Sequence, residues 1–504
     1  MKLISSTILV SCALLLSRVV GFIRDMILAA KLGTSLINDA FLTALRLINM
    51  FRNIFAEGAL SIVFIPVFSK TLNQDGRKSG LIVASQIHLL LILCLLLLII
   101  ISFIIMPQII QYTVPGLKDN IKILKITIVF ARTILPYLFC ISLASFYGAM
   151  LNSLNKFLPF ALVPIIFNLA ITIAVLFFNC FKTTGHTLAI FTTVGGILEL
   201  FWMLFFIFKY KYQLYWHEVR LTSQIKSLIK RMLPVIFLAL LTHLNTWASI
   251  VIISFFNGGI SYIYYAERVM QFPLSLIGTA IGTVLLPVLA KTSIQSSNKE
   301  MISIQNRALE LALLLAVPAA IALFILGENI IFVLFERVNF LSSNTQMVAQ
   351  VLRILSLGLP AFIMVKLFQA KFYAKLDIYI PMVTSMFCLL INTVISVLTV
   401  QLWHFKSLAL ANSISGWINC IILFVFSIYK FDFYIYRGTV KQVFKYFIAS
   451  IIMLLCIYLW QELIICRNKY IDTISQILFG FFIYLICCLL LGVNNIVKNK
   501  YINS

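Results

Sequence analysis

Charged side chains are scarce in this sequence. Only 11% of its 504 residues are Asp, Glu, Lys or Arg, whereas 62% are hydrophobic and the mean hydropathy is +1.05. That balance excludes a soluble globular domain. The run from His88 to Met106 continues for eighteen uncharged residues after the histidine, close to the roughly 20 that cross a hydrocarbon core. The sequence therefore predicts an all-α polytopic membrane protein.

Motifs of common membrane enzymes and pumps are also missing. There is no Gly-x-x-x-x-Gly-Lys-[Ser/Thr] loop, so ATP is not expected to drive the protein directly. There is no His-Glu-x-x-His and no Asp-x-Asp, which disfavours a membrane-embedded protease or glycosyltransferase. The ten cysteines form no Cys-x-x-Cys pair and no Cys/His cluster with metal spacing. We expect no catalytic residue, no metal and no cofactor.

Acidic residues are fewer than basic ones, 16 against 39, which gives a net charge of +23. The basic residues stand in short runs between apolar segments and do not gather in one basic domain. This distribution fits the membrane surface and argues against nucleic acid. The apolar run behind Lys2 has no convincing small-residue cleavage pattern and continues into Arg18 and Arg24, so we expect a retained first helix.

Hydropathy predicts about fourteen membrane spans. Their approximate bounds are 5–30, 38–69, 82–107, 120–150, 157–179, 187–208, 232–256, 261–290, 305–334, 346–370, 379–402, 407–429, 443–465 and 473–495. The termini and the loops after even-numbered spans hold 22 lysines and arginines, and the loops after odd-numbered spans hold nine. By the positive-inside rule, both termini are expected in the cytoplasm.

The sequence also contains an internal repeat. IPVFSKTL (Ile65 to Leu72) closes the second predicted span, and LPVLAKTS (Leu286 to Ser293) closes the eighth, 221 residues later. Two units of that length leave room for two more helices. The predicted parts are an N-terminal lobe of six helices at 1–221, a C-terminal lobe of six at 222–441, and two extra helices at 442–504. Parallel repeats place a substrate cavity at their interface near mid-membrane.

Polar residues within the spans are concentrated on narrow faces. At 100° per residue, the second span carries a stripe about 27 Å long. Its members are Asp39, Thr43, Arg46, Asn53 and Glu57. The eighth span presents Tyr264, Arg268, Gln271 and Ser275 on one side. In the first span, a bend at Gly21 would aim both Arg18 and Arg24 inward. We expect these three helices to line a wet, cationic chamber.

Two interpretations of these charges stay open. In the first, arginines pair with nearby acids and lock helices together: Arg24 with Asp25, Arg46 with Asp39 or Glu57, and Arg268 with Glu267. In the second, a surplus of arginine binds an anion, because Arg18, Arg24, Arg46, Arg52 and Arg268 face only Asp25, Asp39, Glu57 and Glu267. Guanidinium groups bind phosphate oxygens in bidentate geometry. The surplus favours a transporter for an anionic head group.

Three segments resemble one family. SRVVGFIRD (Ser17 to Asp25), FRNIFAEGA (Phe51 to Ala59) and YYAERVMQFPLSLIGTAIGTVLLPVLAK (Tyr264 to Lys291) look like the MurJ (MviN) lipid II flippases of the multidrug/oligosaccharidyl-lipid/polysaccharide (MOP) exporter superfamily. The resemblance covers the chain end to end. It implies a flippase for peptidoglycan and cell wall biogenesis in the bacterial inner membrane. The expected substrate is lipid II, which is undecaprenyl-diphosphate-disaccharide-peptide, moved from the cytoplasmic to the periplasmic leaflet by alternating access.

The resemblance also implies roles for residues at matching positions. Arg18, Arg24 and Arg268 would contact the diphosphate or its sugar, supported by Arg52. Gating or charge balance is expected from Asp25, Asp39, Arg46, Glu57, Glu267 and Gln271. The last two helices would form a groove for the polyprenyl tail. Gln271 departs from the glutamate common in the family, which leaves an ion pair or proton role there open.

Other functions remain to be weighed. The same fold could export another polyprenyl-diphosphate-linked glycan, whereas a cationic-drug exporter would need an acidic cavity. An inert scaffold would leave the costly buried charges unexplained. The expected partners are lipid II and membrane lipids, with cell-wall synthesis proteins as candidates, and a monomer is expected. Membrane potential would favour outward movement of the diphosphate, and an ion that couples to transport is not identified.

Overall fold

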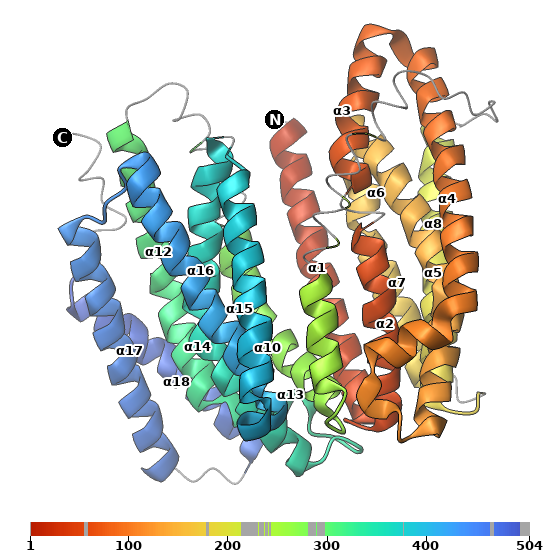
Figure 1. Ribbon diagram of the computed structural model, residues 1–504. Helices are drawn as coiled ribbons and strands as arrows, with labels where there is room; N and C mark the ends of the chain where they lie inside the picture. The colour runs from red at the N-terminus through yellow and green to blue at the C-terminus, as the bar shows by residue number, and fades with distance from the viewer. Residues whose placement is uncertain are drawn as a thin grey trace. The chain divides into compact units, whose positions relative to one another are not determined.

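The computed structural model describes residues 2–54, 59–177, 181–212, 230, 236, 240, 243–280, 289, 298–375, 377–463 and 468–493. Throughout these ranges the regular structure is helical, and no β-strand occurs in them (Figure 1). The helices are α1 (Lys2–Leu32), α2 (Leu36–Arg52), α3 (Ala59–Gln74), α4 (Gly76–Thr113), η2 (Pro115–Leu117), α5 (Ile121–Ser153), α6 (Leu158–Ala161), α7 (Val163–Phe177), α8 (Thr184–Lys209), α10 (Gly259–Ala280), α12 (Asn298–Ile325), α13 (Gly327–Phe335), α14 (Ser342–Ala374), α15 (Tyr379–Trp403), η4 (His404–Lys406), α16 (Ser407–Phe431), α17 (Arg437–Leu463) and α18 (Lys469–Leu490). The predicted all-α fold is confirmed.

The helices follow the predicted membrane spans. Among the described residues, nine helical stretches are long and apolar enough to cross a membrane, and one of them, Tyr379–Phe431, holds two predicted spans joined at η4. The charge-bearing first, second and eighth spans coincide with α1, α2 and α10. The seventh is described in part, as the apolar helix His243–Ile253. This pattern fits a polytopic chain of about fourteen spans.

The second predicted span differs from its expected form. Instead of one helix over 38–69, α2 ends at Arg52, a π-type turn follows at Asn53 and Ile54, and α3 begins at Ala59. The backbone N–H of Asn53 is shared between the carbonyls of Asn49 and Met50. Glu57 lies outside the described residues. The lower part of the predicted polar stripe therefore has no described place.

The chain forms two compact units. Unit 1 comprises Met1–Ser261 and Arg337–Phe340, and unit 2 comprises Tyr262–Glu336 and Leu341–Ser504. Unit 1 contains α1 to α8, and unit 2 contains nearly all of α10 and α12 to α18. The lobe boundaries drawn from the sequence repeat stay a prediction.

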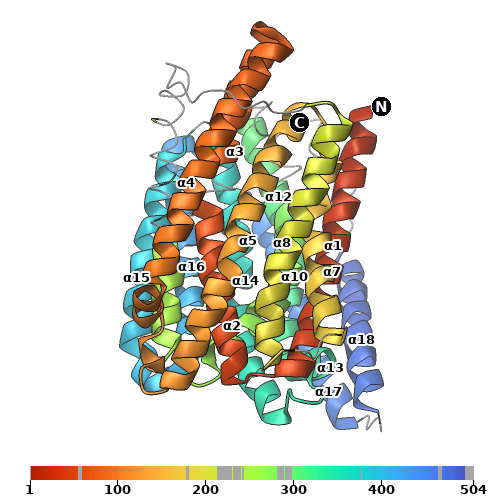
Figure 2. The ribbon, with the colours of Figure 1, turned by 90° about the vertical axis from the view of Figure 1, so that its right-hand side faces the viewer.

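The internal repeat is visible in the helices. α14 begins at Ser342 and ends at Ala374, in each case 221 residues after the corresponding end of α5, at Ile121 and Ser153. In unit 1, α5 packs against α4 and α8, and α8 packs against α7 (Figure 2). In unit 2, α14 packs against α12 and α16, and α16 packs against α15. The same helix order builds the same packing twice.

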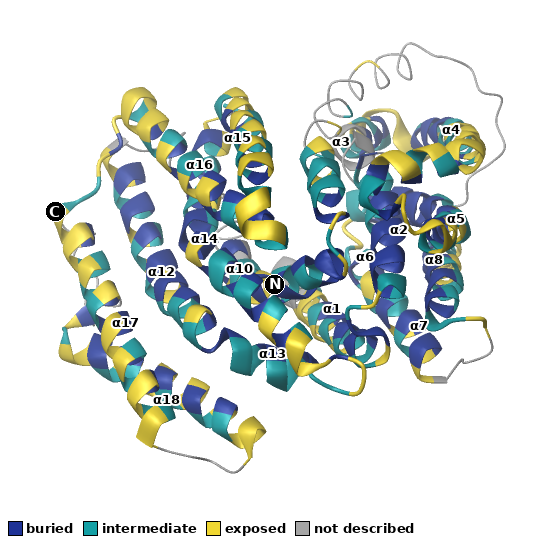
Figure 3. Cartoon of the chain, turned by 60° about the horizontal axis from the view of Figure 1, so that its bottom comes forward, coloured by how far each residue is buried: buried dark blue, intermediate teal, exposed yellow. Residues whose placement is uncertain are grey.

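Burial follows the positions of the helices within their units. α5 is the central helix of unit 1 and buries large side chains such as Phe130, Tyr137 and Phe146. α4 instead exposes much of its apolar surface, including Leu97 and Ile104, as the yellow residues of Figure 3 show. Long helices that expose apolar faces are suited to lipid rather than water. At the other end of the chain, α17 packs against α12 and α18.

Close approach of α8 to α5 depends on Gly196. A Cβ at this position would lie 2.5 Å from Cδ2 of Tyr137. That ring is 1% exposed and lies 5.1 Å from the ring of Phe167, centroid to centroid, so it has little room to move. Unit 2 repeats the arrangement, because a Cβ at Gly416 of α16 would lie 2.6 Å from Cε1 of Phe362 of α14.

We expect Gly196→Ala to lower the free energy of unfolding by about 1–3 kcal/mol, the usual cost of overpacking, although alanine is the better helix former. Gly327→Ala is the matched control, because its Cβ would meet Leu352 at an ordinary 3.6 Å. Thermal unfolding of the purified protein in detergent measures both. Equal unfolding temperatures for the two variants would contradict the close packing of α8 on α5.

Candidate functional site

Arg24 of α1 is held in place by three polar groups of unit 1. Its Nη2 and Nε donate to Oδ1 of Asp25 at 2.6 and 3.0 Å, and its Nη1 donates to Oδ1 of Asn168 in α7 at 2.9 Å. The amide of Asn168 also donates to the carbonyl of Ser17 at 3.4 Å. The side chain of Asp25 is fully buried and that of Arg24 is 11% exposed. The ion pair expected by the first interpretation of the charges is therefore present here.

Arg18 is placed differently on the same helix. Its side chain is half-buried, and within the part of the chain that the structure describes its guanidinium makes no hydrogen bond or ion pair. It lies six residues before Arg24, which is about 9 Å along the helix axis. One of the two arginines of α1 is thus compensated by an acid, and the other carries its full charge.

Arg52 ends α2 and points toward α5. Its Nη1 lies 3.4 Å from the hydroxyl of Tyr137, and its Nη2 lies 3.5 Å from Oδ1 of Asn53. These are long contacts, so the guanidinium is positioned without being neutralised. Arg46 is half-buried on the same helix, and its charge acts favourably on the carboxylate of Asp39.

Asp39 caps the first turn of α10. Its Oδ2 accepts from the backbone N–H of Gly258 at 2.8 Å, and its Oδ1 accepts from the N–H and hydroxyl of Ser261 at 2.9 and 2.5 Å. The carboxylate is 3% exposed. Backbone N–H groups at a helix start lack helical partners and carry partial positive charge, which a carboxylate stabilises. A residue of the second span thereby holds a segment more than 200 residues later.

Neighbouring groups reinforce this cap. The amide of Asn38 donates to the carbonyl of Gly33 at 2.8 Å and to the hydroxyl of Ser261 at 3.0 Å. The amide of Asn339 donates to the carbonyl of Lys31 at 2.7 Å. Gly33 has φ +57°, and a Cβ there would overlap the carbonyl oxygen of Asn339. The turn between α1 and α2 is thus fastened to the start of α10 and to the segment Arg337–Phe340, all within unit 1.

The remaining predicted residues lie on α10 in unit 2. Glu267 and Arg268 are half-buried, and Gln271 is exposed. The structure brings together Arg24 and Asp25 within unit 1, and it places Arg18 and Arg52 in the same unit. The convergence of Arg268 with these arginines, and the site that all four would form, stay a prediction.

Sequence reasoning missed several partners in these contacts. Asn168 stands alone as an amide in the apolar run IIFNLAI, and an isolated polar residue in a span often bonds to a neighbouring helix. That signal could have identified it. Gly258 and Ser261 gave no comparable signal. The described residues contain no group of three or more His, Cys, Asp or Glu that could hold a metal ion.

Solved structures define the class of the fold. The chain superposes on an inward-facing multidrug resistance MATE family transporter of the MOP superfamily with a TM-score of 0.67 at 13% identity, covering 82% of this chain and 94% of that one. A likeness at this identity concerns the fold alone. The chain is therefore a multispan helical protein with the fold of MOP superfamily transporters.

More similar proteins define the family. A probable lipid II flippase MurJ of Rhizobium tropici is 34% identical, over 84% of this chain and 81% of that protein. The probable flippase of Rickettsia prowazekii (strain Madrid E) is 32% identical over 93% and 91%. A solved lipid II flippase MurJ in an inward closed conformation matches with a TM-score of 0.83 at 27% identity, over 97% of this chain and all of that one. The family model described as lipid II flippase MurJ matches residues 28–479. The chain belongs to the MurJ lipid II flippase family.

Removing the Asp39 carboxylate should release the start of α10. We expect Asp39→Ala to lower the free energy of unfolding by about 1.5–3 kcal/mol, because hydrogen bonds to a buried charged acceptor are lost. Asp75→Ala is the control, since Asp75 is exposed and its side chain makes no capping hydrogen bond to α4. Thermal unfolding compares the two. A loss no larger for Asp39→Ala than for the control would show that the cap is not stabilising.

Proposed function

We propose that this chain transports lipid II, the undecaprenyl-diphosphate-linked precursor of peptidoglycan, from the cytoplasmic to the periplasmic leaflet of the bacterial inner membrane. Membership of the MurJ family supports this proposal. The observation that carries its mechanism is Arg18, a half-buried guanidinium inside a membrane helix with no hydrogen bond or ion pair among the described residues. A charge in that position is costly unless an anion neutralises it.

The lipid diphosphate is the anion of suitable chemistry. The two arginines of α1 differ in preparation for it: Arg24 is oriented by Asp25 and Asn168, whereas Arg18 contributes an uncompensated charge. Guanidinium groups offer pairs of N–H donors that match phosphate oxygens. In this proposal Arg18, Arg24 and Arg268 contact the diphosphate or its sugar, and Arg52 supports them from its place beside Tyr137.

Alternating access would use the acids of the site as gates and counter-charges. Asp39 is placed to gate, because its hydrogen bonds to Gly258 and Ser261 fasten α2 to the start of α10 and would have to break for the two to separate. Asp25 balances the charge of Arg24, and Arg46 that of Asp39. Glu57, Glu267 and Gln271 are assigned to the same tasks by matching position alone.

The membrane supplies the rest of the proposed setting. With both termini in the cytoplasm, an inside-negative potential would favour outward movement of the diphosphate by about 2.3 kcal/mol per charge per 100 mV. Helices α17 and α18 would hold the polyprenyl tail. The transporter would act as a monomer with lipid II and membrane lipids as partners, and cell-wall synthesis proteins are further candidates. An ion could reset the carrier, and no residue is assigned to it.

The test is rescue of cells depleted of their own flippase, read as accessibility of lipid II head groups at the outer leaflet. The parent chain should restore accessibility. Arg18→Gln should reduce it by roughly 10- to 100-fold, the equivalent of losing charge-assisted hydrogen bonds of about 1.5–3 kcal/mol, and should keep the thermal stability of the parent. Arg353→Gln is the control, because Arg353 forms an exposed ion pair with Glu328 at 3.3 Å.

Arg24→Gln and Arg268→Gln complete the series at matched membrane abundance. Arg24→Gln should lose both transport and stability, because Asp25 and Asn168 lose their partner. Full rescue by Arg18→Gln would overturn the proposed role of that arginine. Failure of a stable, abundant parent to restore accessibility would overturn lipid II as the substrate.

A further inference from the structure

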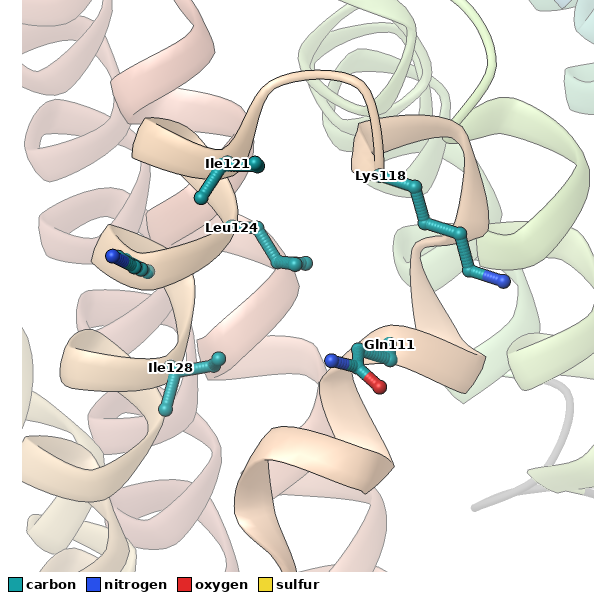
Figure 4. Close-up of a pocket in the computed structure, with 6 residues that line it drawn as sticks. Gln111, Lys118, Ile121, Leu124 and Ile128 are labelled. Carbon is teal, nitrogen blue, oxygen red and sulfur yellow. The ribbon is translucent and has the colours of Figure 1, made fainter.

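A pocket of about 480 Å³ lies in unit 1, away from the arginines of α1 (Figure 4). Its lining residues are Gln111 of α4, Lys118 after η2, and Ile121, Leu124, Lys125 and Ile128 of α5. In Figure 4, Leu124 and Ile128 of α5 occupy one side, and Gln111 and Lys118 occupy the other. The pocket therefore combines two ammonium groups with an apolar wall. A ligand that fits it has an anionic end and an apolar end.

The pocket lies where the chain turns from one membrane span to the next. In the proposed orientation this turn faces the periplasm. The periplasmic loops contain only nine lysines and arginines, and three of them, Lys118, Lys122 and Lys125, fall in this one turn. The only acid between residues 114 and 128 is the exposed Asp119. Positive charge is thus concentrated at a surface from which the rest of the sequence largely withholds it.

The cationic surface continues along α5 into the membrane. Arg132 lies seven residues after Lys125, on the same helix face and about 10 Å further along the axis. Its Nε donates to the carbonyl of Phe103 in α4 at 3.1 Å, and its guanidinium carbon lies 4.7 Å from the centre of the Phe103 ring. Its two terminal nitrogens have no hydrogen-bond partner among the described residues.

Apolar side chains beside Arg132 face outward. Phe103 is 48% exposed, and on the same helix Ile100 and Ile104 are 56% and 66% exposed. This surface of α4 matches the acyl chains of a lipid, while Lys118, Lys125 and Arg132 match a phosphate. A soluble anion would not need the apolar surface, and a zwitterionic lipid would bring its own cation toward the lysines.

We propose that this pocket binds an anionic phospholipid of the membrane in which the protein lies. Its phosphate lies between Lys118 and Lys125, with Arg132 below them, and its acyl chains lie along the exposed face of α4. The site is separate from the proposed lipid II site and does not depend on transport activity. Only the assignment to the outer leaflet rests on the proposed orientation.

The experiment uses the full chain, purified in detergent, with phosphatidylglycerol and phosphatidylcholine of identical acyl chains, and counts bound lipid by native mass spectrometry. The parent should retain phosphatidylglycerol at least tenfold better than phosphatidylcholine. Lys118→Gln combined with Lys125→Gln should weaken phosphatidylglycerol binding by roughly 10- to 30-fold. Lys122→Gln is the matched control, because Lys122 is exposed in the same turn but does not line the pocket.

Several outcomes would overturn the proposal. They are equal retention of the two lipids by the parent, unchanged phosphatidylglycerol binding by the double variant, and an equal loss in Lys122→Gln. Complete displacement of the lipid by millimolar inorganic phosphate would indicate a site for a soluble anion instead. Thermal unfolding of each variant checks that the loss of binding is not a loss of fold. Rescue of lipid II transport by the double variant separates this site from the proposed function.

Discussion

The cost of a charge in a hydrocarbon environment governs this molecule. Each guanidinium placed in a membrane helix must be neutralised, hydrated or withdrawn to the interface, because the bilayer core offers no compensation. Arg24 is neutralised by Asp25 and oriented by Asn168. Arg132 bonds to a carbonyl of α4 and stacks on Phe103. Arg18 has neither arrangement among the described residues, and that difference makes it the residue on which the proposed transport depends.

Carboxylates serve a second purpose in the same environment. Asp39 accepts hydrogen bonds from three donors at the start of α10, and it thereby ties together segments far apart in the chain. Such a cap is strong because it is buried, yet it can be broken as one unit when the segments move apart. A contact of this kind suits a protein whose proposed cycle alternates between two states.

The repeated architecture separates framework from function. α5 and α14 have the same length, the same displacement as the sequence repeat, and equivalent neighbours in their own units. Glycines at the α5–α8 and α14–α16 contacts allow equally close packing. The charged residues do not repeat in this way: Arg24, Asp25 and Asp39 belong to unit 1 alone. A duplicated scaffold therefore carries different side chains in its two copies.

Much of the fold could be predicted from the sequence because hydropathy and charge asymmetry are local signals. The long apolar runs, the repeat ending at Pro66 and Pro287, and the neighbours Arg24 and Asp25 are all visible in the primary structure. The break after Arg52 was not, because the apolar pattern continues through it. Asn168 bonds across 144 residues, and Ser261 bonds across 222. Such pairings depend on how helices pack, which periodicity does not encode.

The most direct test of the account is the affinity of the purified chain for lipid II and for an undecaprenyl monophosphate analogue with the same sugar and peptide. If Arg18 completes a diphosphate site, the parent binds lipid II the more tightly of the two. Arg18→Gln then loses that preference and retains the thermal stability of the parent. Equal preference for the diphosphate in the parent and in Arg18→Gln would contradict the account, and the charge of Arg18 would need another explanation.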